Sequence, residues 1–302
     1  MLIGTHNVNG IRATLNRGWG DWLTGRGLDV LALQEVRCRA EHLPAGAFGD
    51  FVATLDLGTL AGRNGVAILT RTPPVRVRTL SGSALQVIAD EHRTPDADAI
   101  SSRVLRRFAH EGRYLEVDLS DAPLRVASLY LPKGAVPHHH ARPGEDVDQA
   151  KYDRKMTFMA GLARHLTQSR REASADGREF LVMGDFNIAH TRADLRNWRT
   201  NQRSEGFLPE EREWFSSVLG SRTLRDVVRE RRPDDEGPYS WWSWRGQSFN
   251  NDTGWRIDYH LASPGLAARA GEAVVDREAD YDQRLSDHAP VIVDYSTDRT
   301  AG

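Results

Sequence analysis

Residues 2–35 read LIGTHNVNGIRATLNRGWGDWLTGRGLDVLALQE, and this stretch decides the fold class. It predicts a short apolar strand over 2–6, a glycine-interrupted helix over 11–23 and a buried apolar strand over 29–33. A strand, a crossover helix and a second strand usually make a parallel pair. Asn7 follows the first strand directly and Glu35 follows the second after one residue, so we expect their side chains to lie side by side at one sheet edge.

Strands and helices continue to alternate along the rest of the chain. Further strands are predicted over 65–69, 114–119, 124–131, 180–183, 256–261 and 291–295, and helices over 148–166 and 209–219. The segments 81–102 and 133–146 are polar, contain proline and lack periodicity, which predicts long surface loops. No repeat or linker divides residues 1–302, so we expect a single domain of mixed β-sheets flanked by helices.

The composition is that of an ordinary globular protein, with 39% hydrophobic and 27% charged residues. No segment is apolar for long enough to span a bilayer, so no membrane partner is expected. The chain starts without the basic and apolar regions of a signal peptide, which argues against export. Cys38 is the only cysteine, so an intramolecular disulfide and a multi-cysteine zinc site are excluded and a reducing cytoplasm fits best.

The charge balance limits how the chain could hold a nucleic acid. Its formal net charge is −2, whereas proteins that grip phosphates usually carry a basic surplus, so any such surface must be local. The candidate is the segment 192–203, where Asp194 is the one acid among four arginines, Arg192, Arg196, Arg199 and Arg203. A solvated basic loop explains the same pattern equally well.

Polar side chains follow the predicted strands along the whole chain. They are Asn7, Glu35, Asp185, Asn187, Asp258, Asp287 and His288. A single Asp after a strand is most often a helix cap or turn former. Together, however, these groups suit phosphodiester hydrolysis, which needs a hard metal ion, a polarised water and donors for phosphate oxygens. Carboxylate and amide oxygens favour magnesium (Mg²⁺), with Glu35 and Asp287 as the obvious ligands.

Two histidine patterns have different interpretations. We interpret the run His138, His139 and His140 as part of a solvated loop, because adjacent histidines cannot easily share one ion. Asp258 lies within a predicted strand, where an unpaired charge would be costly, and His288 is its natural partner. A carboxylate bound to an imidazole favours the cationic form, which can bind phosphate. A structural bond from Asp258 to the backbone is the alternative.

A series of motifs resembles one family in order and over essentially the whole chain. The motifs are HNVNGIRA, LALQEVRC, GVAIL, SLYLP, GDFNIAH, DLRN, GFLPEEREW, YSWWSWR, GWRIDYHLAS and SDHAPV. They resemble the exonuclease III and abasic-site endonuclease family within the endonuclease/exonuclease/phosphatase superfamily. The resemblance implies an α/β fold of the deoxyribonuclease I type, a four-layer αββα sandwich of two packed mixed β-sheets flanked by helices, with a magnesium site at one edge.

The resemblance also implies roles for individual residues. Glu35 would be the principal metal ligand, assisted by Asn7, Asp287 and Asn9. Asp185 would orient or deprotonate the attacking water, and Asn187 would position that water or a phosphate oxygen. His288, held by Asp258, and Tyr130 would stabilise the pentacovalent phosphate. Whether Asp185 acts as base or as acid is open, because its pKa depends on its neighbours.

Substrate choice rests on other residues. By resemblance, Trp241, Trp255 and Ile257 would line a pocket for a flipped sugar that lacks its base, which costs little stacking energy to extrude. Trp242 and Trp244 are better explained as core residues. Candidate phosphate contacts are Arg12, Arg37, Arg113, Arg192, Arg196 and Arg199. Lys133 stands where relatives usually carry Asn or Gln, and Ser204 stands where some relatives carry Asn. Both departures bear on substrate preference and leave the catalytic groups intact.

These observations predict a magnesium-dependent DNA-repair nuclease, for which manganese is a plausible substitute metal. It would cut 5′ to an abasic site, and would also act as a 3′-to-5′ exonuclease and trim blocked 3′ ends in double-stranded DNA. The alternatives are a phosphodiesterase of the same superfamily for a non-DNA phosphoester, and a DNA-end or lesion-binding protein that does not cut. We expect a monomer in the cytoplasm, associated with the nucleoid, whose partners are duplexes with abasic sites, nicks or blocked 3′ ends.

Overall fold

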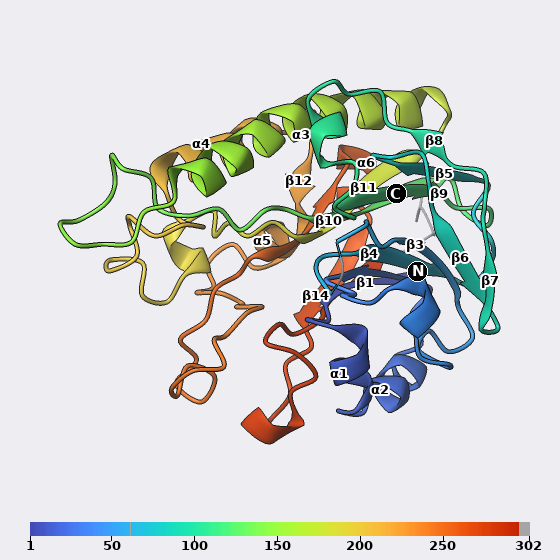
Figure 1. The fold of residues 1–302 in the computed structure, drawn as a ribbon, viewed down its shortest axis with the longest axis horizontal. Helices are drawn as coiled ribbons and strands as arrows, with labels where there is room; N and C mark the ends of the chain where they lie inside the picture. The colour runs from blue at the N-terminus through green and yellow to red at the C-terminus, as the bar shows by residue number, and fades with distance from the viewer. Residues whose placement is uncertain (61, 296–302) are drawn as a thin grey trace.

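The computed structural model describes residues 1–60 and 62–295. Two mixed β-sheets pack face to face, and helices cover the outer face of each sheet (Figure 1). This arrangement confirms the expected four-layer sandwich. It follows from the sequence because strands that are buried on both sides need one face against the other sheet and one against a helix.

The first sheet has eight strands among the described residues. Its order is β14 (Ala270–Val275), β15 (Val291–Tyr295), β1 (Leu2–Asn7), β2 (Val30–Gln34), β4 (Val66–Thr70), β3 (Val52–Asp56), β6 (Leu85–Ile88) and β7 (Glu91–Arg93). β1 and β2 are parallel, with Asn7 opposite Gln34, as the crossover pattern predicts. Their carboxyl ends therefore meet at one edge, where the active-site residues begin.

The second sheet has seven strands in the described part of the chain. Its order is β12 (Arg225–Asp226), β13 (Asp258–Ala262), β11 (Glu179–Asp185), β10 (Leu124–Tyr130), β9 (Tyr114–Asp118), β5 (Arg76–Thr79) and β8 (Asp98–Ala99). β10 and β11 are parallel, whereas β13 runs antiparallel to β11 and places Asp258 opposite Asp185.

The helices form the two outer layers. They are α1 (Ile11–Leu15), α2 (Trp19–Gly25), α3 (Gln149–Ala175), α4 (Pro209–Val218), α5 (Val227–Arg231) and α6 (Pro264–Ala267), with short 3-10 turns at Ala40–His42, Leu105–Phe108, Arg192–Asp194 and Tyr281–Gln283. In Figure 1 the long α3 lies along the top of the molecule, and α1 and α2 lie below the opposite sheet.

Apolar side chains fill all three interfaces between these layers. Ile68 from the first sheet and Met183 from the second belong to one buried cluster between the sheets. Phe158 of α3 packs in a second cluster over the outer face of the second sheet, and Trp19 of α2 packs in a third over the first. Full burial of each such side chain contributes about 1.5 to 3 kcal/mol. The sheets are thus held rigidly enough to fix residues at their edges.

Helix α3 is longer than the sequence pattern predicts. It begins after Asp148, whose carboxylate accepts a hydrogen bond from the Lys151 backbone N–H and caps the helix. The expected helix ends at residue 166, but the observed helix continues to Ala175. Its last turns are almost wholly polar, and only Ser169 and Ala173 are buried there. Hydrophobic periodicity therefore fades before the helix ends.

The expectation of a long loop over 81–102 is wrong. This segment contains β6, β7 and β8, and β6 and β7 form an antiparallel hairpin at the edge of the first sheet. Ala89 and Asp90 make the tight turn with φ angles of 49° and 63°. Strands of two to four residues are too short to show alternation. By contrast, 133–146 is irregular, as expected.

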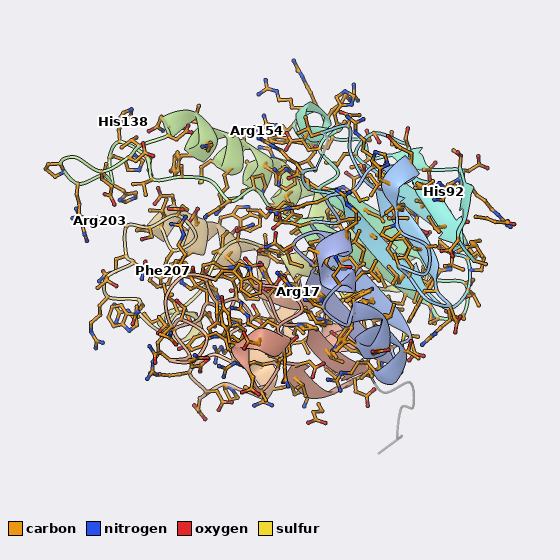
Figure 2. The ribbon with its side chains drawn as sticks, turned by 60° about the horizontal axis from the view of Figure 1, so that its bottom comes forward. Arg17, His92, His138, Arg154, Arg203 and Phe207 are labelled. Atoms are coloured by element: carbon orange, nitrogen blue, oxygen red, sulfur yellow. The ribbon has the colours of Figure 1, made fainter. Side chains whose placement is uncertain are left out.

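Figure 2 labels His92 of β7 at one extremity and His138 and Arg203 near the other. Strands β3, β5, β12 and β14 also escaped the sequence pattern, and each pairs with at least one strand that was expected. Among the described residues, no helix combines the length and apolar character needed to cross a membrane.

Candidate active site

The site starts where the parallel strands β1 and β2 end. The amide nitrogen of Asn7 lies 2.9 Å from Glu35 Oε1 and 2.9 Å from Asp185 Oδ2, and donates a hydrogen bond to each carboxylate. Asn7 is fully buried, so its amide has few other partners to choose from. One side chain thus links the edges of both sheets and holds the two acids close together.

Asp185 at the end of strand β11 and Asn187 just beyond it form the second group of residues. The backbone of β11 lies very close to that of β10 at Gly184. A Cβ atom on Gly184 would lie 2.1 Å from the Leu129 carbonyl oxygen, so only glycine fits directly before Asp185. The Asp185 carboxylate then accepts the backbone N–H of Asn187 at 2.8 Å. The Asn187 amide donates to the Leu131 carbonyl at 2.9 Å, which fixes its side chain beside Asp185.

His288 is held by a buried carboxylate, as expected from the need of Asp258 for a partner. His288 Nδ1 lies 2.8 Å from Asp258 Oδ2, and its Nε2 faces Asp185 Oδ2 at 3.8 Å. Ser240 donates its hydroxyl to Asp258 Oδ2 at 2.7 Å. Because Ser240 Oγ also accepts the Asp258 backbone N–H at 3.1 Å, it fixes the carboxylate relative to its own strand.

The backbone of the site is conformationally strained. Asn9, Glu35, Arg37 and Asn187 all have positive φ angles, between 47° and 53°. Residues other than glycine rarely adopt this conformation, and each instance costs on the order of 1 to 3 kcal/mol. The surrounding sheets must supply that energy. Such strain clusters where side-chain placement matters more than local stability.

Burial and neighbouring acids raise the pKa of Asp185 to about 7. Burial is the largest cause, and the negative charges of Asp258 and Glu35 add to it. The positive charge of His288 and the Asn187 N–H act in the opposite direction and are outweighed. A carboxyl group with this pKa can exchange a proton near neutral pH.

The pKa of His288 moves the other way from what burial alone would cause. Burial lowers the pKa, but the carboxylates of Asp258 and Asp185 outweigh it and raise the pKa of His288 to about 10. The imidazole is therefore a buried cation at neutral pH. Burial together with Glu35 and Asp185 also keeps the pKa of Tyr130 well above its usual range, so its phenol remains a hydrogen-bond donor.

The carboxylates of the site are suited to a cation. Glu35, Asp185 and His288 each offer one atom within 4.8 Å of the others, and all three are buried. The Glu35 carboxylate also pairs with Arg37. Asp258 Oδ1 is buried without a hydrogen-bond partner among the described residues. The excess of negative charge in a confined space fits a divalent metal ion.

Asp287 lies at the rim and connects the acids to the aromatic residues. It accepts hydrogen bonds from the Asn9 amide at 2.7 Å and from the Trp241 indole at 3.1 Å. In the observed orientation the amide nitrogens of Asn7 and Asn9 face the carboxylates. A role for either amide as a metal ligand requires the opposite orientation and stays a prediction, as does that role for Asp287.

An apolar wall lies next to these charges. The rings of Trp241 and Trp255 meet edge to face, with centroids 6.3 Å apart. Ile257 packs with them against the buried Leu195 and Phe207. The wall and the acids line one cleft of about 530 Å³. An apolar face beside a charged one suits a ligand with both a hydrocarbon and a phosphate part.

The cleft contains most of the side chains predicted from the sequence. It is lined by Glu35, Arg37, Tyr130, Asp185, Asn187, Trp241, Trp255, Ile257, Asp287 and His288. It is also lined by Lys133, Asn197, Asn201, Ser204 and Thr253, which were not predicted as site residues. Asn197 ends the DLRN motif, so its sequence signal was present, although only the arginines of that segment were predicted to contact DNA. Ser240 gave no sequence signal, because its role depends on packing against Asp258.

The predicted arginines are not gathered in one place. Arg37 lines the cleft. Arg113 instead donates hydrogen bonds to Glu111 and to the Tyr130 carbonyl. Their contacts with DNA stay predictions, as do those of the exposed Arg12 and Arg196, the second of which pairs with Glu236.

The basic segment 192–203 differs from expectation in one respect. Asp194 does not face the loop arginines, because it is buried and accepts hydrogen bonds from Arg256 and Arg229. The guanidinium groups of Arg192 and Arg199 instead lie 4.4 and 4.6 Å from the Trp198 ring centroid. With its acid turned inward, the outer surface of this segment is more basic than its sequence suggests.

Trp242 and Trp244, the two tryptophans interpreted as core residues, differ in burial. Trp242 is buried against Phe249, as expected for a core residue. Trp244 is only partly buried and lies beneath Arg284, with the guanidinium carbon 4.2 Å from its ring centroid. Neither ring lines the cleft.

Comparison with known proteins gives a consistent result. The model of the Endonuclease/Exonuclease/phosphatase family matches residues 4–288. The DNA repair nuclease APEX1 of Danio rerio is 30% identical over 296 residues, covering 96% of this chain and 81% of the relative. The exodeoxyribonuclease of Bacillus subtilis (strain 168) is 26% identical, covering 96% and 98%. The structure of the 3′ phosphatase NExo from Neisseria, bound to a product DNA hairpin, superposes with a TM-score of 0.77 at 27% identity, covering 98% and 99%.

Proposed function

This chain belongs to the endonuclease/exonuclease/phosphatase family, and we propose that within it the protein is a magnesium-dependent DNA-repair phosphodiesterase. Its main reaction is cleavage 5′ to an abasic site in duplex DNA. It also removes nucleotides and blocking groups from 3′ ends. The observation that carries the proposal is one cleft that combines a buried acid and histidine cluster with an apolar wall formed by Trp241, Trp255 and Ile257.

We assign the metal to the oxygen donors of the cleft. Glu35 would be the principal ligand, with Asp185 and Asp287 close by. These are hard oxygen ligands of the kind that Mg²⁺ takes, and Mn²⁺ would substitute for it. When bound, the ion would neutralise negative charge on the phosphate and polarise its oxygens. Asn7 would keep Glu35 and Asp185 close together through its two hydrogen bonds.

The chain's own groups would then carry out the proton transfers and hold the phosphate. Asp185 would orient a water molecule and accept its proton as the water oxygen bonds to phosphorus. The bond between phosphorus and the 3′ oxygen would break, and the leaving oxygen would take a proton from solvent water to become a 3′ hydroxyl. His288 is held as a cation by Asp258 and would bind a non-bridging oxygen, assisted by the phenol of Tyr130 and the amide of Asn187. General base catalysis contributes typically about 10²- to 10⁴-fold to such a rate.

The apolar wall would select the lesion. A sugar without a base presents mainly hydrocarbon, and it can leave the helix at little cost in stacking energy. Trp241 and Trp255 meet edge to face beside Ile257, and the apolar surface that they form would pack against such a sugar. The hydrogen bond from Trp241 to Asp287 would join this surface to the metal site.

The DNA backbone would be held by a few local cations, because the whole chain has a formal net charge of −2. Arg37 and Lys133 in the cleft, with Arg192 and Arg199 beside Trp198, are our candidates. Arg12, Arg113 and Arg196 complete the set predicted from the sequence. We further propose a monomeric, single-domain enzyme of the cytoplasm that works in association with the nucleoid.

The test is a time course with labelled duplexes that carry an abasic analogue, a nick, a 3′ phosphate or no damage. We expect Mg²⁺ to support incision 5′ to the analogue faster than any reaction on undamaged duplex, and EDTA to abolish both. Absence of incision, together with hydrolysis of a small phosphoester, would identify a non-DNA phosphodiesterase. Tight binding of the damaged duplex without turnover in Mg²⁺ or Mn²⁺ would identify a lesion-binding protein.

A further inference from the structure

A second cluster of metal-ligand side chains lies in the histidine run of 138–140, which the active site does not use. His140 Nε2 lies 3.0 Å from Glu210 Oε2, and His139 Nε2 lies 3.3 Å from Glu210 Oε1. The run lies in a loop, as expected, with His138 and His139 exposed, but the ring centroids of His139 and His140 lie 4.5 Å apart and both rings face one carboxylate. Figure 2 shows His138 of the same run beyond the N-terminal end of α3.

The spacing of these atoms matches a tetrahedral metal site. Zinc bonds to imidazole nitrogen and carboxylate oxygen are about 2.0 to 2.2 Å long, so ligand atoms in a tetrahedron lie about 3.3 Å apart. The ligand atoms of His139, His140 and Glu210 all lie within 4.8 Å of one another. His140 and Glu210 are about one-fifth exposed and His139 is more exposed, so water could occupy a fourth position.

Helix α3 supports the carboxylate from behind. The Tyr152 hydroxyl donates to Glu210 Oε1 at 2.7 Å, and the Tyr152 ring meets the His139 ring edge to face at 5.6 Å. Groups that orient a metal ligand in this way typically account for about 10- to 100-fold in metal affinity. The cluster therefore joins three separate elements, which are the 133–146 loop, α3 and the first turn of α4.

We propose that His139, His140 and Glu210 bind a zinc ion that clamps the 133–146 loop to α3 and α4. Imidazole nitrogen is a good ligand for Zn²⁺ and a poor one for Mg²⁺, so this site selects a different ion from the oxygen-rich cleft. The two sites share no ligand. The proposal therefore does not depend on the function assigned to the cleft.

The zinc ion would restrain the 133–146 loop, whose first residue reaches the cleft. Lys133 lines the cleft, and its carbonyl accepts a hydrogen bond from the buried Lys155 of α3 at 3.1 Å. Lys155 also pairs with Glu211, the neighbour of Glu210, at 2.6 Å. The start of the loop is thus fixed by a hydrogen bond from a lysine that is ion-paired in the protein interior, and zinc would fix the middle of the loop at the surface.

A zinc titration of the full chain in excess Mg²⁺ tests the proposal. Zn²⁺ is titrated against a chromophoric chelator, and Co²⁺ is used in parallel because its visible spectrum reports coordination geometry. We expect one saturable site, a four-coordinate Co²⁺ spectrum and a thermal midpoint that rises with Zn²⁺ concentration, as ligand binding to the folded state requires.

Substitutions separate a built site from simple chelation by a histidine run. Glu210→Gln and His140→Ala should abolish the site, and Tyr152→Phe should weaken binding by about 10- to 100-fold. His139→Ala changes the most exposed ligand, so its folding is not at risk, and it should also lose the four-coordinate spectrum. His138→Ala is the matched control, since His138 belongs to the run but not to the cluster, and its affinity should equal that of the unchanged protein.

Two results would overturn the proposal. One is the lack of any saturable Zn²⁺ site in excess Mg²⁺, which would leave the two imidazoles as hydrogen-bond partners of Glu210 only. The other is equal loss of affinity in His138→Ala and His140→Ala with none in Glu210→Gln, which would indicate chelation by the run alone.

Discussion

Two of the buried charge clusters in the described part of the chain differ in how their acids are compensated by cations. In the arginine cluster, Arg256 donates two hydrogen bonds to the Asp226 carboxylate, at 2.7 and 2.9 Å. Asp194 accepts hydrogen bonds from both Arg256 and Arg229. Burial alone would raise the pKa of Asp194, but the two guanidinium groups outweigh it and hold the pKa well below its usual range. Each acid there has a cation bonded to it.

The cleft cluster lacks that compensation. Asp185 and Asp258 share the cation of His288, and Glu35 has only Arg37, which is partly exposed. The pKa of Asp185 is consequently raised above its ordinary value, whereas the pKa of Asp194 is lowered below it. Both clusters are buried and rich in acids, so burial does not distinguish them. The excess of acid over base marks the cluster that has a ligand to bind.

The largest expected effect is on catalysis. Asp185→Asn removes the proposed proton acceptor and should slow incision of an abasic duplex by about 10²- to 10⁴-fold while DNA binding persists. Gel-based incision rates and fluorescence anisotropy measure the two properties. Asp56→Asn is the matched control, because Asp56 is buried outside the cleft and burial raises its pKa to about 7 as well. A comparable loss of activity in Asp56→Asn would contradict the role of Asp185.

The next effect concerns the arginine cluster. Arg256→Ala leaves Asp226 without its cation and deprives Asp194 of one, so the free energy of unfolding should fall by about 3 to 5 kcal/mol. Urea denaturation followed by fluorescence measures the change. Arg196→Ala is the control, because Arg196 and Glu236 form an exposed pair whose loss should cost less than about 1 kcal/mol. Equal costs for the two variants would show that the arginine cluster is not structural.

A smaller effect should appear in the pH dependence of stability without metal. The folded pKa of Asp185 is about 7 and its ordinary value is 3.8, so between these values the folded state binds more protons than the unfolded state. Stability from this group is therefore present below pH 4 and is lost as the pH rises through 7. The stability of Asp185→Asn relative to the unchanged protein should rise over the same range, by no more than a few kcal/mol.

Denaturation curves in EDTA at several pH values provide that measurement. Asp194→Asn should behave in the opposite sense, because the pKa of Asp194 is lowered on folding and its stabilisation is lost only in acid. At pH 8 the first substitution should thus raise stability and the second should lower it. The same sign for both variants would remove the distinction between the clusters.

The sequence predicted the site correctly where regular secondary structure or the pairing of a buried charge fixes the position of a residue. Asn7 and Glu35 could be paired because each ends a strand of one crossover unit, and a parallel register leaves little freedom in where they meet. Asp258 and His288 could be paired because a buried carboxylate requires a partner. Helices α1 to α4 followed from helical periodicity, whereas the short α5 and α6 did not.

The sequence was a poor guide where distant segments meet without a regular element between them. Ser240 acts through a turn that contacts Asp258, and Glu210 meets His139 only because α4 docks beside α3. The burial of Asp194 was also missed, since its partners Arg229 and Arg256 lie far along the chain. Irregular packing sets these contacts, and local patterns do not report it.

The most direct test is the shift in thermal midpoint that Mg²⁺ causes in the unchanged protein, in Glu35→Gln and in Asp56→Asn. If the unbalanced acids of the cleft bind the ion, saturating Mg²⁺ should raise the midpoint of the unchanged protein and of Asp56→Asn, and should leave Glu35→Gln where it is in EDTA. An equal rise in all three proteins, or no rise in the unchanged protein, would contradict the account.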